Sequence, residues 1–317
     1  MRNLIWFNED HCDRIQYTGG KGASLSKMHK FRLNVPNGFV ISAPFFFEYR
    51  KENNLDEKII KLIDTIDFDD CACIEKVSEE IRKMVINTPI SAELENDILS
   101  YYGMLGGEIQ PVAVRSSSTA EDLDDASFAG QQETFLYVMG KDDLIEKIKE
   151  CWASLYNGRA VFYRKQRGFC EKDVSIAVVV QKMVNAEKAG VMFTVNPITK
   201  DRDQALIEAA WGLGEAVVSG TVTPDNYIVD KKTSKVIEEY VSEKEMMFVR
   251  NCSLKGVEEK DVPEELKCRR VLTDEELSEL LNLSHKLEKF FGKPEDVEWA
   301  IEGGNVYLLQ SRPITTL

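Results

Sequence analysis

The sequence is poor in the features that mark several common classes of protein. It has 3 histidines in 317 residues, and its 40 lysines and arginines are outnumbered by 54 acids, for a formal net charge of −14. Nucleic acids and anionic membranes are usually held by a basic surface, so we expect neither as a partner. The chain also lacks any apolar run close to the roughly 20 residues that a transmembrane helix needs.

The seven cysteines do not form a recognisable site. They are scattered, and the only close pair, Cys71 and Cys73, lacks the C-x-x-C spacing of zinc or thioredoxin-like sites. This usage indicates reduced thiols in a cytosolic protein. The N-terminal MRNLIWFNED turns acidic after a short apolar run, unlike a signal peptide. We therefore expect a cytoplasmic protein.

The order of the predicted elements indicates the fold class. A hydrophobic content of 43% and a length of 317 residues suit two domains or one bilobal domain. Helical patterns dominate residues 44–102 and are followed by strand patterns, a sequence of elements that predicts an α+β protein in two lobes. The predicted strands lie at 111–114, 174–184, 190–195, 205–210, 227–230 and 235–241.

Several helix ends carry their own signals. Ser91 and Asp142 are expected to be N-caps, because each precedes a helical pattern. Thr273 begins a capping box, and the helix that it starts is expected to end at Gly292. Residues 251–272, just before it, are polar and are expected to be irregular.

The stretch Gly19-Gly20-Lys21-Gly22 directly precedes a predicted helix over residues 22–31. Glycines allow a bound group to approach the backbone, and amide groups with an ammonium at a helix N-terminus suit a phosphate. A flexible turn with a solvated lysine explains the same residues, so both interpretations stay open. The pattern is not a Walker A loop, since G-x-x-x-x-G-K-[ST] occurs nowhere in the chain.

A single cation follows the predicted strand 111–114. Arg115 precedes three serines, and the small-residue segment 126–131 comes soon after it. An arginine at a strand end can hold phosphate oxygens in a bidentate fashion, and the later amides can surround an anion. An ion pair between Arg115 and the acids of residues 121–125 is an equally good explanation.

The C-terminal segment DVEWAIEGGNVYLLQSRP predicts a hairpin. A three-residue loop at 303–305 would place Glu298 opposite Gln310 and Asp296 opposite Arg312. It would also put Val297, Trp299, Ile301, Tyr307 and Leu309 on one apolar face. A carboxylate, an amide and an arginine on the other face suit Mg²⁺ and phosphate oxygens. A solvated polar face with a surface salt bridge is the alternative.

Two further segments give weaker signals. Residues 181–184, Gln-Lys-Met-Val, end a buried-type strand, and their backbone could meet a planar base, although a plain strand end looks the same. Residues 212–215, Gly-Leu-Gly-Glu, lack the third glycine of a dinucleotide-binding loop.

Together, these segments identify a family. GGKGASLSKM, VAVRSSSTAEDLDDASFAGQQETFLYV, CWASLYNGRAVFYR, VVVQKMV, GVMFTVNP, AAWGLGEAVVSGTVTPDNY and DVEWAIEGGNVYLLQSRPIT occur in one order and spacing. The chain resembles, from about residue 3 to its end, the nucleotide-binding domain of the phosphoenolpyruvate synthase, pyruvate phosphate dikinase and rifampin phosphotransferase family. The resemblance implies one ATP-grasp-like domain over residues 1–317, with approximate lobes 1–180 and 181–317 and the nucleotide between them.

The resemblance also implies roles for individual residues. Phosphates would be bound by Lys21 and Arg115, and a loop over residues 127–134, including Gly130, Gln131 and Thr134, would cover them. Gln181, Met183 and Val184 would meet the adenine, and Glu215 is a further nucleotide contact. Mg²⁺ would be held by Glu298 and Gln310, with Asp296 as a lesser candidate, and Arg312 would contact phosphate.

In this family ATP gives its β-phosphate to a histidine on a swivelling domain, which leaves AMP and inorganic phosphate. That histidine lies in a segment resembling GG-x-T-[SC]-H-A, which this sequence does not contain. The resemblance therefore implies an ATP-dependent phosphotransferase that acts on a phosphohistidine domain in trans and reaches a small-molecule acceptor through it. A non-catalytic ATP-sensing module is the alternative.

Overall fold

The computed structural model describes residues 3–107, 109–119, 133–169, 175–251 and 256–315. The chain forms two compact units. Unit 1 comprises residues 1–31 and 37–183, and unit 2 comprises residues 32–36 and 184–317. Both units combine helices with antiparallel strands, which confirms the predicted α+β class. No described helix combines the length and hydrophobicity that crossing a bilayer requires.

Unit 1 is a five-stranded sheet with helices on both faces. Its elements are β1 (Leu4–Trp6), α1 (Ile15–Lys30), β2 (Gly38–Ile41), α2 (Ala43–Glu52), α3 (Leu55–Ile63), α4 (Cys71–Asn87), α5 (Ala92–Gly106), β3 (Val112–Ser118), β4 (Thr134–Val138), α6 (Lys141–Ala153), the 3₁₀ turn η1 (Ser154–Tyr156), α7 (Gly158–Arg167) and β5 (Ile176–Lys182).

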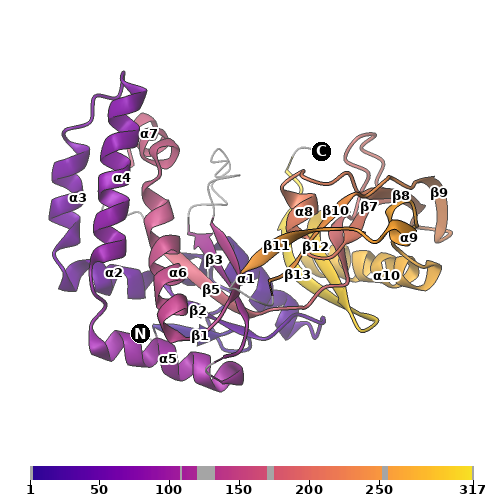
Figure 1. The fold of residues 1–317 in the computed structure, drawn as a ribbon, viewed down its shortest axis with the longest axis horizontal. Coiled ribbons are helices and arrows are strands. Elements are labelled where there is room, and N and C mark those ends of the chain that lie inside the picture. Colours follow the sequence, from indigo (N-terminus) through magenta and orange to yellow (C-terminus); the bar gives the residue numbers. More distant parts are fainter. Residues whose placement is uncertain (1–2, 108, 120–132, 170–174, 252–255, 316–317) are drawn as a thin grey trace. The chain divides into compact units, whose positions relative to one another are not determined.

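The two faces of this sheet carry different helices. The strand order is β1-β2-β5-β3-β4, and every neighbouring pair is antiparallel. Figure 1 shows α2 to α7 on one side and α1 on the other. Phe39 and Ile41 belong to the core beneath α2 to α7, whereas Val40 faces Gly22 of α1. The strand alternation therefore sets aside one face for α1.

Unit 2 is a six-stranded antiparallel sheet in the order β13-β12-β6-β7-β8-β9, with a separate two-stranded sheet β10-β11. Its elements are β6 (Lys188–Phe193), β7 (Gln204–Trp211), α8 (Glu215–Val218), β8 (Asp225–Asp230), β9 (Lys235–Tyr240), β10 (Met246–Arg250), β11 (Val257–Asp261), α9 (Glu264–Lys267), α10 (Asp274–Phe291), β12 (Glu295–Glu302) and β13 (Asn305–Pro313).

The six-stranded sheet also has two distinct faces. On one face, Lys188 of β6 forms an ion pair of 2.7 Å with Glu276 of α10. On the opposite face, Val191 and Ala210 pack against Ala216 and Val217 of α8. This second face, which we call the α8 face, also carries the predicted metal ligands.

The helix-end predictions had mixed outcomes. The Thr273 capping box is present, and Gly292 ends α10 in the left-handed conformation. Ser91 occupies the N-cap position, but its side chain makes no capping hydrogen bond. The prediction for Asp142 was wrong, because Gly140 is the N-cap of α6.

The prediction that residues 251–272 are irregular was also wrong in part. Residues 257–261 form β11, and β10 pairs with it in a register from Met246–Asp261 to Arg250–Val257. The polar sequence concealed a strand because the side chains of β11 are mostly exposed on both faces.

The two serine and threonine caps give a stability prediction. Thr273→Ala removes a side-chain acceptor for the Glu276 amide at 3.3 Å and should lower the free energy of unfolding by about 1 kcal/mol. Ser91→Ala is the matched control, since the Ser91 hydroxyl has no hydrogen-bond partner among the described residues. Urea denaturation followed by circular dichroism measures both variants. Equal losses in the two variants would contradict the capping assignment.

Candidate functional site

The glycine-rich kink within α1, at Gly19, packs directly on β3. Gly19 has φ +67°, and a Cβ there would lie 2.2 Å from the Ser117 hydroxyl oxygen, so no other residue fits without displacement. The Gly22 amide donates to that same oxygen at 3.3 Å, and Ser117 donates to the Thr18 carbonyl at 2.8 Å. The glycines therefore allow the backbone of α1 to rest on the strand that carries Arg115.

Both predicted phosphate-binding cations of unit 1 lie on this face. Lys21 donates from Nζ to the Ser116 carbonyl at 3.0 Å. Arg115 faces α1, because Ser117, two residues later in β3, contacts that helix. Each cation is only 8% exposed, so a solvated turn does not describe Lys21. Burial at an anion site increases the strength of a cation–phosphate contact.

Two other predicted residues share the face with Arg115. Thr134 lies directly opposite Arg115 in the β3–β4 ladder, and Gln181 follows Val179, the β5 partner of Arg115, by two residues. Both ladders therefore direct these side chains to the same side. Gly130, Gln131 and the acids at 121–125 lie outside the described residues.

The backbone at the end of β5 is partly engaged. The Met183 amide donates to the Pro111 carbonyl at 3.1 Å, and the Lys182 amide donates to the Asn37 carbonyl at 2.8 Å. The Val184 amide donates to no atom of the described residues. The Val184 amide can therefore donate a hydrogen bond to the edge of a planar base.

In unit 2, the C-terminal hairpin pairs the predicted residues. Glu298 lies opposite Gln310 and Asp296 opposite Arg312, which confirms these two pairs. The predicted three-residue loop is wrong. The turn has two residues, Gly303 and Gly304, with φ +56° and +76°, as in a type I′ turn.

A β-bulge reconciles this shorter turn with the predicted pairs. Glu298 pairs with Gln310 but Trp299 pairs with Leu308, which leaves Leu309 as the extra residue. Val297, Trp299 and Ile301 of β12 share a buried face as predicted, but the face predicted for Tyr307 and Leu309 of β13 is wrong. Val306 and Leu308 are buried, whereas Tyr307 and Leu309 pack with Ala300 on the α8 face.

The Gln310 side chain has an unsatisfied oxygen. The residue is 7% exposed, and its Oε1 accepts no hydrogen bond from the described residues. A buried carbonyl oxygen without a partner is costly unless a ligand uses it. Directly across the ladder lies the carboxylate of Glu298. An amide oxygen and a carboxylate are hard oxygen ligands, so this pair fits Mg²⁺.

The protein alone supplies few metal ligands. Within the described residues, no group of three or more His, Cys, Asp or Glu side chains could hold a metal ion. A Mg²⁺ ion at Glu298 and Gln310 would therefore take its other ligands from phosphate oxygens and water, as is usual for this ion.

Asp296 and Arg312 form an ion pair of 2.7 Å on the same face. The pKa of Asp296 is nevertheless raised. Burial is the largest cause and the Glu298 charge adds to it, whereas Arg312 acts in the opposite direction. Arg312 is 63% exposed, so solvent weakens its effect on the carboxylate. Its exposed guanidinium is accessible to a phosphate.

The sequence reasoning missed a third carboxylate. Glu208 of β7 pairs with Val191, which in turn pairs with Glu298, so both acids face α8. Two strand spacings separate their backbones by about 10 Å. Partial burial and the nearby Asp296 raise the pKa of Glu208. A single acid within the apolar run ALIEAAW was the signal that could have identified it.

Glu215 begins the short helix α8. Its side chain is exposed to solvent, but the neighbouring protein still removes part of its hydration and thereby raises the pKa of the carboxyl group. The turn before it places Gly212 at φ +77° against the Phe248 carbonyl of β10.

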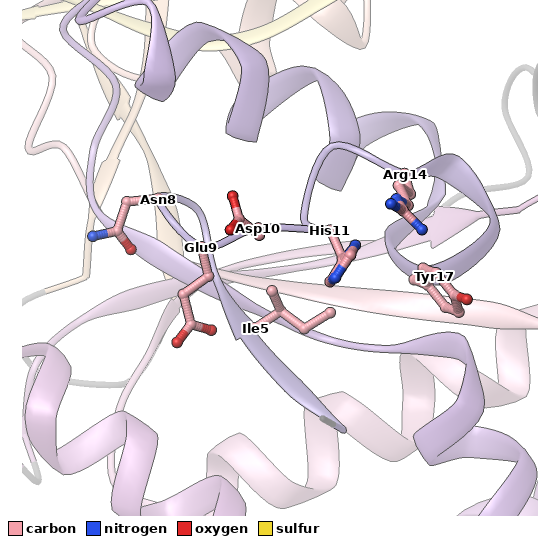
Figure 2. A pocket seen from close by; sticks show the side chains of 7 residues that line it. All are labelled: Ile5, Asn8, Glu9, Asp10, His11, Arg14 and Tyr17. Carbon is pink, nitrogen blue, oxygen red and sulfur yellow. The ribbon is translucent and has the colours of Figure 1, made fainter. Parts of the chain in front are cut away.

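Unit 1 also contains a hollow of about 770 Å³, and none of the predicted site residues is among the described residues that line it. Figure 2 shows Asn8, Glu9 and Asp10 toward one side of it and Arg14 and Tyr17 toward the other. The two carboxylates in its lining oppose a triphosphate, so it does not compete with the face of Lys21 and Arg115 as a nucleotide site.

Comparison with known proteins identifies the relatives of the chain. Residues 15–317 match the family described as pyruvate phosphate dikinase, AMP/ATP-binding domain. A probable phosphoenolpyruvate synthase from Methanocaldococcus jannaschii is 46% identical over 100% of this chain and 27% of its own length. A rifampicin phosphotransferase from Bacillus cereus is 36% identical over 99% of this chain and 36% of its own. The chain thus spans less than half the length of these relatives.

Among solved structures, a D-alanine–D-alanine ligase from Bacillus anthracis aligns with a TM-score of 0.32 and 13% identity. The alignment covers 76% of this chain and 56% of the ligase.

The raised pKa of Glu208 predicts the effect of Glu208→Gln on stability. A carboxyl whose pKa is raised by folding stabilises the protein at low pH, and this contribution is lost as the pH rises through the folded pKa. The variant should therefore have a larger free energy of unfolding than the wild type at pH 7, and the difference should vanish in acid. Denaturation at several pH values measures it, with the exposed Glu238 changed to Gln as control. A variant no more stable than the wild type at pH 7 would contradict the argument.

Proposed function

The chain belongs to the pyruvate phosphate dikinase AMP/ATP-binding domain family, and on this basis we propose that it binds Mg·ATP and phosphorylates a histidine of a separate swivelling domain. AMP and inorganic phosphate are the other products. The observation that carries the proposal is that Glu298 lies opposite Gln310, whose buried oxygen accepts no hydrogen bond within the described part of the chain. A metal ion bound to phosphates would supply the partner that the Gln310 oxygen lacks among the described residues.

The proposed phosphate contacts come from three cations. Lys21 and Arg115 are held on one face of unit 1 and bind phosphate oxygens, and the Thr134 hydroxyl beside Arg115 adds a donor. Arg312 of unit 2 contributes the third charge. Phosphoryl transfer depends mainly on positioning and charge neutralisation, so these groups supply most of what the reaction needs. The segment with Gly130 and Gln131 is proposed to cover the phosphates.

Mg²⁺ is proposed to bind Glu298 and Gln310, with Asp296 as a lesser ligand because Arg312 already pairs with it. When bound, the ion neutralises charge on the transferred phosphate. Glu208, on the same face, orients water in the metal shell or accepts a hydrogen bond from it.

The nucleoside part is proposed to contact the segment from Gln181 to Val184 and the carboxylate of Glu215. The Val184 amide and the Met183 carbonyl offer a donor and an acceptor to the edge of a base. A carboxylate accepts hydrogen bonds from hydroxyl groups and repels phosphates, so Glu215 suits the sugar end of the nucleotide.

The partner is proposed to be a phosphohistidine domain, either in the same polypeptide or in trans. The relatives named above are longer than this chain, which supports a further domain. The histidine is proposed to pass the phosphate to a small molecule, and the further domain would supply the contacts to that molecule. A cytoplasmic location fits the acidic composition and the scattered free cysteines, and is part of the same proposal.

Glu298→Gln tests the metal assignment. The substitution removes the charge of the side chain but keeps its size. It should weaken the binding of Mg·ATP by about tenfold or more and have little effect on the binding of metal-free ATP. Calorimetric titration with and without Mg²⁺ separates the two. Glu302→Gln is the control, because Glu302 lies on the same face of β12 beside the turn. Unchanged Mg·ATP binding by Glu298→Gln would rule out this ligand.

The transfer itself is tested in trans. The chain, Mg·ATP and a phosphohistidine domain of a family member should yield AMP, phosphate and a phosphorylated histidine, and omitting the domain should prevent all but slow hydrolysis. Labelled ATP and mass spectrometry detect the three products. If ATP binds but neither AMP nor phosphohistidine forms, the chain is an ATP-binding module without the transfer activity.

A further inference from the structure

Asp225 and Lys244 of unit 2 form an ion pair that is fully buried. Both side chains are 0% exposed, and the carboxylate and the ammonium are in direct contact. Asp225 is the first residue of β8, and Lys244 lies between β9 and β10. Neither residue belongs to the nucleotide site proposed above.

The carboxylate of Asp225 accepts hydrogen bonds from several segments at once. Besides Lys244, its donors are the Ser242 amide at 3.0 Å, the Tyr227 hydroxyl at 3.0 Å and the Val271 amide at 2.8 Å, whereas the Ser242 hydroxyl donates to the Thr223 carbonyl at 2.7 Å. Burial raises the pKa of Tyr227, so its hydroxyl remains a donor at neutral pH. The network thus joins β8 to the segments on both sides of the β10–β11 hairpin.

Those segments are also joined to each other. The Lys244 ammonium donates to the Ser242 carbonyl at 2.7 Å, and the Lys244 amide donates to the Lys267 carbonyl at 2.9 Å. The Leu272 amide donates to the Tyr227 hydroxyl at 3.3 Å. The ion pair therefore fixes the position at which β10 begins.

The middle of β10 in turn holds the turn before Glu215. The Leu213 amide donates to the Phe248 carbonyl at 2.9 Å, and Gly212 comes so close that a Cβ would lie 2.4 Å from that oxygen. Met246 and Phe248 also pack against Ala216 and Val217 of α8. In the sequence, Glu215 lies between Leu213 and Ala216, so β10 contacts the chain on both sides of it.

We propose that Asp225 and Lys244 are positioning residues for the nucleotide contact at Glu215. The buried pair sets the position of β10, the Phe248 carbonyl sets the turn at residues 212–214, and this turn holds the Glu215 carboxylate in place. The inference rests on the proposed role of Glu215.

The chemistry of the pair supports a positioning role over a purely stabilising one. Two buried charges lose their hydration, and apolar residues of similar size often stabilise a fold as well or better. An ion pair surrounded by fixed donors has one permitted geometry, whereas apolar packing tolerates several. Three hydrogen bonds besides the ammonium contact thus define the position of one carboxylate.

A double-mutant cycle tests the inference. Asp225→Asn should weaken ATP binding by about tenfold, measured by calorimetry well below the melting temperature of each variant. In a Glu215→Gln background the same change should have little further effect, because the group that it positions is gone. If Glu215→Gln leaves ATP binding unchanged, the proposed role of Glu215 is wrong. If both single variants weaken binding and their effects simply add, the positioning role is overturned.

A second pair of variants avoids the ion pair and keeps the test valid if Asp225→Asn fails to fold. Gly212→Ala places a methyl group against the Phe248 carbonyl, whereas Gly220→Ala has a similar φ of +72° with no atom within 4 Å. Both variants carry the strain of a left-handed alanine, so any difference between them reports the contact with β10. Gly212→Ala should weaken ATP binding severalfold more than Gly220→Ala, and equal effects would overturn the proposal.

Discussion

One extra residue in β13 determines which side chains the C-terminal hairpin presents to the α8 face. The bulge at Leu309 shifts the ladder, so Glu298 meets Gln310 while Trp299 and Leu308 stay in the core on the other face. Without it, the two-residue turn would pair the same strands one residue out of step, and the amide would lose its place opposite the carboxylate. The candidate metal ligands, and every role that depends on them, follow from this register.

In unit 1 the corresponding constraint is the absence of side chains at the Gly19 kink of α1 and one turn after it. Gly19 and Gly22 let the helix rest on Ser117, and the same strand then directs Arg115 toward it. Two cations that are nearly buried are thereby kept on one face of the sheet. A larger residue at position 19 would separate the helix from the strand and with it Lys21 from Arg115.

The acids on the α8 face are arranged against the stability of unit 2. Asp296 and Glu208 have raised pKa values because burial and neighbouring acids oppose their ionisation. A fold selected for stability alone would not gather acids on a partly buried face. Such an arrangement is expected where a cation is to be bound, since the metal ion reverses the sign of the interaction.

The sequence by itself determined the α+β class, most helices and strands, the family and the pairs Glu298–Gln310 and Asp296–Arg312. Local signals carry these features, because turn glycines, capping residues and apolar alternation act over a few residues.

Only the tertiary structure decided the Leu309 bulge, the place of Glu208 on the α8 face and the network of Asp225. A three-residue loop and a two-residue loop with a bulge shift the ladder by the same single residue, so the pattern near Glu298 could not distinguish them. Glu208 and Asp225 depend on strands that meet only when the sheet forms, and no local pattern encodes that meeting.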